Sequence, residues 1–122
     1  MKPSWVIADE RLEELKNLNL PSSGKNKEYY TLLSDIVRRF IEARFSLRAP
    51  EMTTQEFLGY ISSRHLNSEH NELLQGFLNS CDMVKFAKYG PSLKETATSF
   101  DMAKKLINAL KEPTMIAPQR TA

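Results

Sequence analysis

The sequence predicts an all-α fold, a single-domain bundle of about five helices. Apolar residues recur at helical spacing, two capping boxes precede such stretches, and no segment shows the alternating pattern of a strand. The chain has 122 residues, of which 41% are hydrophobic and 26% are charged, and this composition is typical of one globular domain. A core of this size forms without a disulfide or a structural metal.

The segments of about residues 7–18 and 26–45 are predicted to be the first two helices. Pro and Gly residues separate them. Each carries one apolar face at the 3.6-residue period, which consists of Ala8, Leu12 and Leu15 in the first segment and of Tyr29, Leu33, Ile36, Val37 and Phe40 in the second. The charged residue Arg44 falls within about 40° of Phe40, on the apolar face of the second segment. The second helix is expected to end before Pro50.

Two capping boxes mark the starts of further helices. Thr53-Thr54-Gln55-Glu56 precedes a short apolar face, and Ser92-Leu93-Lys94-Glu95 precedes a longer one. The expected buried residues are Phe57, Leu58 and Ile61 in the first of these helices and Phe100, Ala103, Ile107 and Leu110 in the second. Residues 1–111 are predicted to form the bundle. Residues 112–122 lack periodicity and are predicted to be a flexible C-terminal tail.

The segment of about residues 69–89 is predicted to be the central helix of the bundle, with Ser68 as its N-cap. Met83 and Phe86 lie on one side of it, and the opposite side carries an apolar stripe of Leu74, Phe77, Leu78, Cys81 and Val84. A helix that is apolar on two sides is typically packed between other helices. Gly90 is expected to adopt the left-handed conformation that ends such a helix.

The sequence contains no pattern that indicates catalysis, a metal site or a cofactor. Cys81 is the only cysteine and the four glycines are dispersed, so no Cys-rich metal site or phosphate-binding loop is predicted. His65 and His70 would lie about 140° apart on one helix, and both are expected to face solvent. His70 and Cys81 would lie about 16 Å apart along a helix, too far for a catalytic dyad. We predict that the protein is not an enzyme.

Charged residues are distributed unevenly along the chain. The net charge is only +2, but residues 25–48 and 82–111 each carry six cationic and three acidic side chains, whereas residues 51–72 carry one Arg and four Glu. A DNA-binding domain is the alternative prediction, because the helix over 26–45, a turn and the helix from Thr53 resemble helix-turn-helix spacing. The acidic charge of the would-be recognition helix argues against it.

Arg44, Asp82 and Lys85 form the candidate polar cluster of this sequence. Asp82 and Lys85 are three residues apart on the helix over 69–89, so they can pair locally. A buried Arg needs a carboxylate partner. We therefore predict an ion pair between Arg44 and Asp82 that fixes the register of the two helices, in preference to a ligand-binding role. In that case Asp82→Ala should cost several kcal/mol.

Three segments resemble a known family: Glu28–Phe45, Leu47–Leu58 and Cys81–Lys88. They are similar to the soluble helical domain of bacterial membrane proteins associated with MoxR-type ATPases and the Bat (aerotolerance) operons. The resemblance covers about residues 5–111, and it implies no catalytic residue. It does imply a location at the cytoplasmic face of the inner membrane, with a transmembrane anchor before Met1. The longest apolar run of this chain, Trp5–Ala8, is too short to be such an anchor.

The predicted function is that of a non-enzymatic protein–protein interaction module, the soluble part of a membrane-anchored bacterial protein. The resemblance implies partners from the same system, either a MoxR-like ATPase or a membrane protein of the von Willebrand factor A type. The uneven charge favours a protein partner over a nucleic acid.

Overall fold

The computed structural model describes residues 2–48 and 52–112, without the side chains of residues 62–64. Pro50 and residues 113–122 of the predicted tail lie outside the described residues. Five α-helices and one short 3-10 helix follow in this order: α1 (Ser4–Leu18), η1 (Pro21–Ser23), α2 (Asn26–Phe45), α3 (Thr54–His65), α4 (Ser68–Phe86) and α5 (Leu93–Leu110). The described residues contain no strand. The prediction of an all-α, single-domain bundle of five helices is confirmed.

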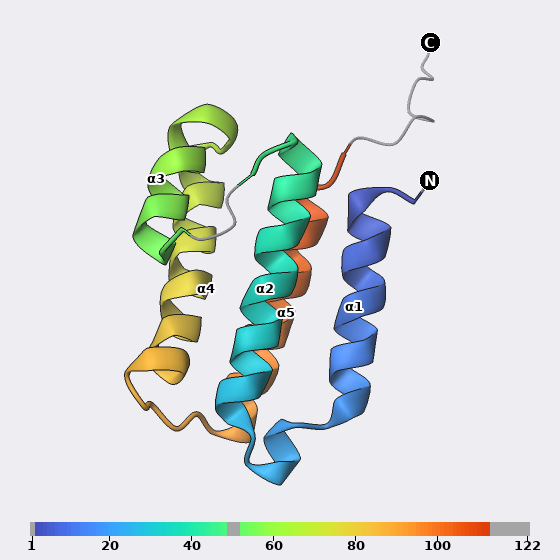
Figure 1. The fold of residues 1–122 in the computed structure, drawn as a ribbon, viewed down its shortest axis with the longest axis vertical. Coiled ribbons are helices and arrows are strands. Elements are labelled where there is room, and N and C mark those ends of the chain that lie inside the picture. Colours follow the sequence, from blue (N-terminus) through green and yellow to red (C-terminus); the bar gives the residue numbers. More distant parts are fainter. Residues whose placement is uncertain (1, 49–51, 113–122) are drawn as a thin grey trace.

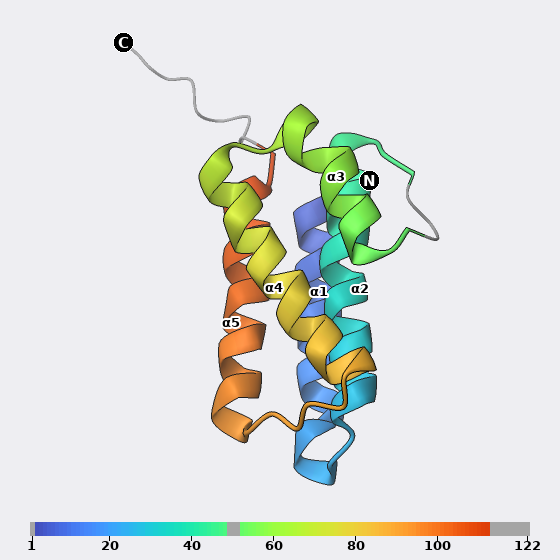
Figure 2. The same cartoon turned by 90° about the vertical axis from the view of Figure 1, so that its left-hand side faces the viewer.

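Four long helices form the bundle, with α1 antiparallel to α2 and α4 antiparallel to both α2 and α5 (Figure 1). The short α3 lies outside them against α4. Helix α1 packs on α2 and α5, while α2, α4 and α5 pack on one another. Helix α4 contacts α2, α3 and α5, which agrees with its predicted central place. In the view of Figure 2, α4 crosses the bundle at a tilt and its lower half diverges from α5. No helix within the described residues combines the length and the apolar character that a bilayer span requires.

One hydrophobic core joins all five helices. It contains every predicted stripe residue of α1, α2, α3 and α4, and Ala103, Ile107 and Leu110 of α5; Phe100 is only partly buried against it. The core also takes up Tyr30 and Ile41 of α2 and Leu106 of α5. The helical period of the sequence therefore identified the inward-facing positions well.

The ends of α3 and α5 are fixed by the two predicted capping boxes. The Thr53 hydroxyl accepts from the N–H of Glu56 at 3.1 Å, and the Glu56 carboxylate accepts from the N–H of Thr53 at 2.9 Å. Ser92 and Glu95 form the same pair of hydrogen bonds, at 3.0 and 2.9 Å. Each box satisfies two N–H groups that the first turn of a helix leaves free.

Three predicted helix ends are wrong. Helix α1 begins at Ser4 and not at Ile7, because the carbonyl of Pro3 already accepts from the N–H of Ile7 at 3.3 Å. The N-cap of α4 is Asn67 and not Ser68, since the Asn67 side chain accepts from the N–H of His70 at 2.7 Å. Helix α4 ends at Phe86, and the left-handed residue after it is Lys88, with φ 60°, instead of Gly90.

Substitution of the two candidate caps of α4 should separate their roles. We expect Asn67→Ala to lower the free energy of unfolding by about 1 kcal/mol, because the N–H of His70 loses its acceptor. Ser68→Ala is the matched control and should have almost no effect, since Ser68 stands inside the helix. Urea unfolding followed by circular dichroism measures both. A larger loss from Ser68→Ala would contradict the assignment of the cap.

Candidate functional site

The structure does not bring the predicted polar cluster together. The Nε–H of Arg44 donates to the carbonyl oxygen of Leu110 at 2.7 Å, and its guanidinium lies over the ring of Phe45. The ammonium of Lys85 instead donates to the hydroxyl of Ser34 at 3.4 Å. The ion pairs within the described residues are Lys2–Glu10 and Asp35–Arg39, so the predicted pair of Arg44 and Asp82 is not formed.

The physical reason is the height of each residue along the bundle. Helices α2 and α4 are antiparallel, and the bond from Lys85 to Ser34 fixes which parts of them lie side by side. Arg44 stands ten residues beyond Ser34, which is about 15 Å along a helix. The prediction placed Arg44 on the inward-facing side of its helix but had no measure of its height relative to Asp82. Arg44 instead places its charge at the C-terminal end of α5, where free carbonyl groups favour a cation.

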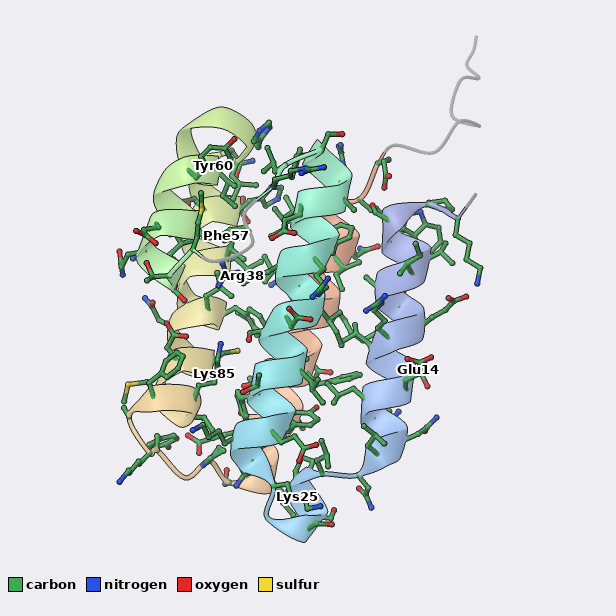
Figure 3. The ribbon with its side chains drawn as sticks, in the orientation of Figure 1. Glu14, Lys25, Arg38, Phe57, Tyr60 and Lys85 are labelled. Atoms are coloured by element: carbon green, nitrogen blue, oxygen red, sulfur yellow. The ribbon has the colours of Figure 1, made fainter. Side chains whose placement is uncertain are left out.

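Arg38 is a positioning residue that the sequence analysis did not identify. One of its guanidinium NH₂ groups donates to the carbonyl oxygen of Met52 at 2.7 Å, and the guanidinium lies 4.6 Å from the centre of the Phe57 ring. These two contacts attach the start of α3 to α2 (Figure 3). Arg38 lies on the polar side of α2, and α3 covers it only in part, so the pattern within α2 gave no signal. His65, which was expected to face solvent, stacks on the ring of Phe45.

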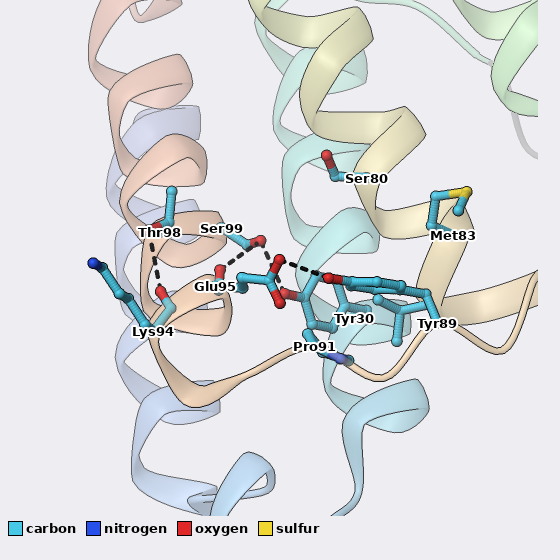
Figure 4. A pocket seen from close by; sticks show the side chains of 10 residues that line it. Tyr30, Ser80, Met83, Tyr89, Pro91, Lys94, Glu95, Thr98 and Ser99 are labelled. Carbon is cyan, nitrogen blue, oxygen red and sulfur yellow. Dashed lines mark hydrogen bonds between the residues drawn. The ribbon is translucent and has the colours of Figure 1, made fainter.

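A hollow lies between the C-terminal half of α4 and the N-terminal half of α5 (Figure 4). Its volume is about 390 Å³. The buried ring of Tyr30, on α2, contributes to its lining, and its hydroxyl is 2.9 Å from that of Ser99. The other lining residues come from α4, α5 and the loop between them: Ser80, Met83, Val84, Tyr89, Pro91, Lys94, Glu95 and Thr98.

Met83 and Tyr89, which line this hollow, are exposed, and so is Phe86, three residues after Met83 on α4. Met83, Phe86 and Tyr89 are 50%, 73% and 45% exposed. Met83 and Phe86 were expected to be covered, as the second apolar side of a central helix. Helix α3 lies along the upper part of α4 only, so the last turn of α4 remains open (Figure 1).

The polar groups of the hollow are largely satisfied within the protein. One carboxylate oxygen of Glu95 accepts from the N–H of Ser92, and the other accepts from the hydroxyl of Tyr89 at 2.7 Å. These hydrogen bonds, first that of the Ser92 backbone and then that of Tyr89, lower the pKa of Glu95. The hydrogen bond between the Tyr89 hydroxyl and Glu95 also raises the pKa of Tyr89. Glu95 therefore carries its negative charge at neutral pH while it holds Tyr89 across the hollow.

The described residues bring neither a reactive thiol nor a metal-binding cluster to the hollow. Cys81 is fully buried on α4, and burial raises the pKa of its thiol to about 12, so the thiol is protonated and shielded from solvent. In residues 2–48 and 52–112 no three His, Cys, Asp or Glu side chains come together in a way that could hold a metal. The hollow offers apolar walls, hydroxyl groups and the exposed Lys94 to a ligand.

Asp82→Ala should change the free energy of unfolding by no more than about 0.5 kcal/mol, because no buried cation depends on Asp82. Arg44→Ala should cost about 1 to 2 kcal/mol, since it removes a charged hydrogen bond to Leu110 and the contact with Phe45. Urea unfolding of both variants checks this order. A loss of several kcal/mol in Asp82→Ala would restore the ion pair that the sequence predicted.

Tyr89→Phe should raise the pKa of Glu95 toward its ordinary value, because one hydrogen bond to the carboxylate is lost. A carboxyl whose pKa is lowered in the folded state adds stability above its unfolded pKa, and this contribution disappears as the pH falls through the folded pKa. NMR titration of the Glu95 carboxyl carbon measures the pKa directly. Tyr29→Phe, which removes a hydroxyl that does not bond Glu95, is the control and should leave the titration unchanged.

No family model, no curated protein and no solved structure matches this chain. The resemblance to the MoxR-associated and Bat-associated proteins therefore remains an expectation that stands on its three sequence segments. The function has to be argued from the hollow between α4 and α5 and from the side chains around it.

Proposed function

We propose that the chain is a non-enzymatic protein–protein interaction module and that it binds its partner at the hollow between α4 and α5. The observation that carries this proposal is the exposure of Met83 and Tyr89 in the lining of a cavity of about 390 Å³, with the exposed Phe86 three residues from Met83 on the same helix. Exposed apolar side chains that gather at one place are typical of interaction sites, because their removal from water favours association.

Exposed apolar side chains are concentrated in this region and are not spread evenly over the surface. The described residues have seven exposed large hydrophobic side chains, and three of them fall within the seven residues from Met83 to Tyr89. Two of these three line the hollow. A partner that inserted one apolar side chain there would contact the Tyr30 ring and cover Met83 and Tyr89 at once. Such a central, desolvated contact carries most of the binding energy in many interfaces.

We further propose that the module is the soluble part of a membrane-anchored bacterial protein at the cytoplasmic face of the inner membrane. Its partner would be a MoxR-like ATPase or a von Willebrand factor A-type membrane protein. The resemblance of the three sequence segments supports this proposal. Much of the similarity is explained by packing, since many of the matching residues of α2 and α3 are buried. The third segment, Cys81–Lys88, also includes the exposed Met83 and Phe86, which the core does not require.

The position of α3 does not support the alternative of a DNA-binding domain. Its apolar side, Phe57, Leu58 and Ile61, is buried in the core, and Glu56 stands at its N-terminal end. Arg38, a cation that could have contacted phosphate, donates to the backbone of Met52. No structural observation therefore favours a nucleic acid as the partner.

Site-specific photocrosslinking tests the proposed module. A photoreactive phenylalanine analogue at position 86 should crosslink to the purified MoxR-like ATPase or von Willebrand factor A-type protein of the same organism. The matched control is the same analogue at Leu18, which is similarly exposed at the end of α1. Absence of a crosslink from position 86 to either protein, or equal crosslinking from both positions, would reject these partners at this surface.

A further inference from the structure

We propose that α3 is a hinged cover, which opens as one unit at Leu66 and Asn67 while the four long helices stay folded, and that Arg38 is its latch. This inference does not rest on the proposed function, because α3 lies along the upper part of α4 and the hollow lies at the lower end (Figure 1). Its evidence is the packing of α3, the backbone that joins α3 to α4, and the contacts that attach α3 to α2.

Helix α3 is the most peripheral of the five helices. Helices α1, α2, α4 and α5 each pack extensively on at least two other helices, whereas α3, within the described residues, does so on α4 alone. Figures 1 and 2 both show α3 outside the group of four long helices. It can therefore move away without separating any two of the long helices from each other.

The backbone between α3 and α4 has the form of a hinge. Only two residues join the helices, and both are extended: Leu66 has φ −122° and ψ 142°, and Asn67 has φ −78° and ψ 175°. Rotation at these two residues needs to break no hydrogen bond within either helix. The side chain of Asn67 accepts from the N–H of His70, so the start of α4 is capped whether or not α3 is in place.

Two contacts attach α3 to α2, one near each end of α3. Near its start, the guanidinium of Arg38 donates to the carbonyl oxygen of Met52 at 2.7 Å and lies 4.6 Å from the centre of the Phe57 ring (Figure 3). At its end, the imidazole of His65 stacks on the ring of Phe45, with 4.6 Å between the ring centres. The Arg38 contact combines a charged hydrogen bond with a cation–π contact, so we assign the latch to Arg38.

Opening would uncover an apolar surface that the closed fold conceals. Phe57, Leu58 and Ile61 are buried in the closed form, and they would become exposed together with the part of α4 on which α3 packs. Helices α2, α4 and α5 keep their own buried side chains in contact with one another, so they can stay folded. Units of this kind open at a lower free energy than the whole domain unfolds.

Native-state hydrogen exchange of the full chain tests this inference. Amide exchange is followed by NMR at rising urea concentrations below the unfolding transition. We expect the amides from Leu58 to Ile61 to exchange at least about tenfold faster than the slowest amides of α2 and α5, because they need only the opening of α3. Their exchange should also depend less steeply on urea, since partial opening exposes less surface than global unfolding.

A variant far from α3 separates local opening from global unfolding. Leu12 is fully buried on α1, and Leu12→Val should accelerate the slowest amides of α2 and α5 by about fivefold or more. The amides of α3 should keep their exchange rates, because α1 stays packed when α3 opens. Equal acceleration of the α3 amides would overturn the inference, since it would show that α3 exchanges only through global unfolding.

Substitution of the latch tests the role of Arg38. Arg38→Ala should accelerate the α3 amides by about tenfold or more, because the opened form does not need the contacts with Met52 and Phe57. Arg39→Ala is the matched control, since Arg39 pairs with Asp35 on its own helix, and it should change these rates by no more than about twofold.

The remaining outcomes decide between the hinge and the latch. If Arg38→Ala and Arg39→Ala accelerate the α3 amides equally, Arg38 is not the latch. If Arg38→Ala does not fold, as judged by circular dichroism, Arg38→Lys takes its place. This variant keeps the charge but loses the planar group over the Phe57 ring, so we expect a smaller acceleration of the same amides. Unchanged exchange of α3 in Arg38→Lys would then reject the latch.

Discussion

The fold depends on the burial of three apolar stripes, those of α2, α4 and α5, against one another. Each of these helices contacts the other two, and together they provide most of the core. Helices α1 and α3 bury three apolar side chains each, which is too little for either helix to be stable alone, so each depends on its packing against the other helices. Helix α1 completes one side of the bundle. Nothing in the described chain does the same for the lower end of α4, and the hollow is the consequence.

The parts of this fold that local chemistry determines were predictable from sequence. The bounds of α2 follow from the Gly before Lys25 and from its continuous apolar period, and the caps of α3 and α5 follow from a hydroxyl and a carboxylate three residues apart. The start of α4 was wrong by one residue, because Asn67 and Ser68 are both good caps and the sequence alone does not choose between adjacent ones. Its end was wrong because Ala87 and Tyr89 both donate to the carbonyl of Met83, which turns the backbone at Lys88 before Gly90 is reached.

The candidate site depends on the relative heights and the crossing angles of the helices. The sequence of one helix alone does not determine either of them. A helical wheel assigns Arg44 to an inward face, but its partner is set by the ends of α2 and α5 meeting at one height, and that partner is the carbonyl of Leu110. In the same way, Arg38 stands on the polar side of α2, and it gains its partly buried contacts with Met52 and Phe57 only because α3 packs beside it. The hollow lies where the lower halves of α4 and α5 diverge, since α4 crosses the bundle at a tilt. A crossing angle depends on which ridges interdigitate, so the sequence pattern of either helix alone cannot supply it.

The stretch from Met83 to Tyr89 contains features that do not contribute to the stability of the fold. Every residue of the predicted stripes of α1 to α4 is buried, but here Met83 and Phe86 are apolar and exposed. In addition, Lys88 holds a left-handed backbone that a lysine adopts only at a cost. A natural sequence that gains no stability from such features is expected to use them for something else. The left-handed turn at Lys88 leads directly to Tyr89, whose hydroxyl Glu95 then holds across the hollow. The conformation that is unfavourable for the backbone is therefore the one that lets the exposed aromatic ring form a wall of the hollow.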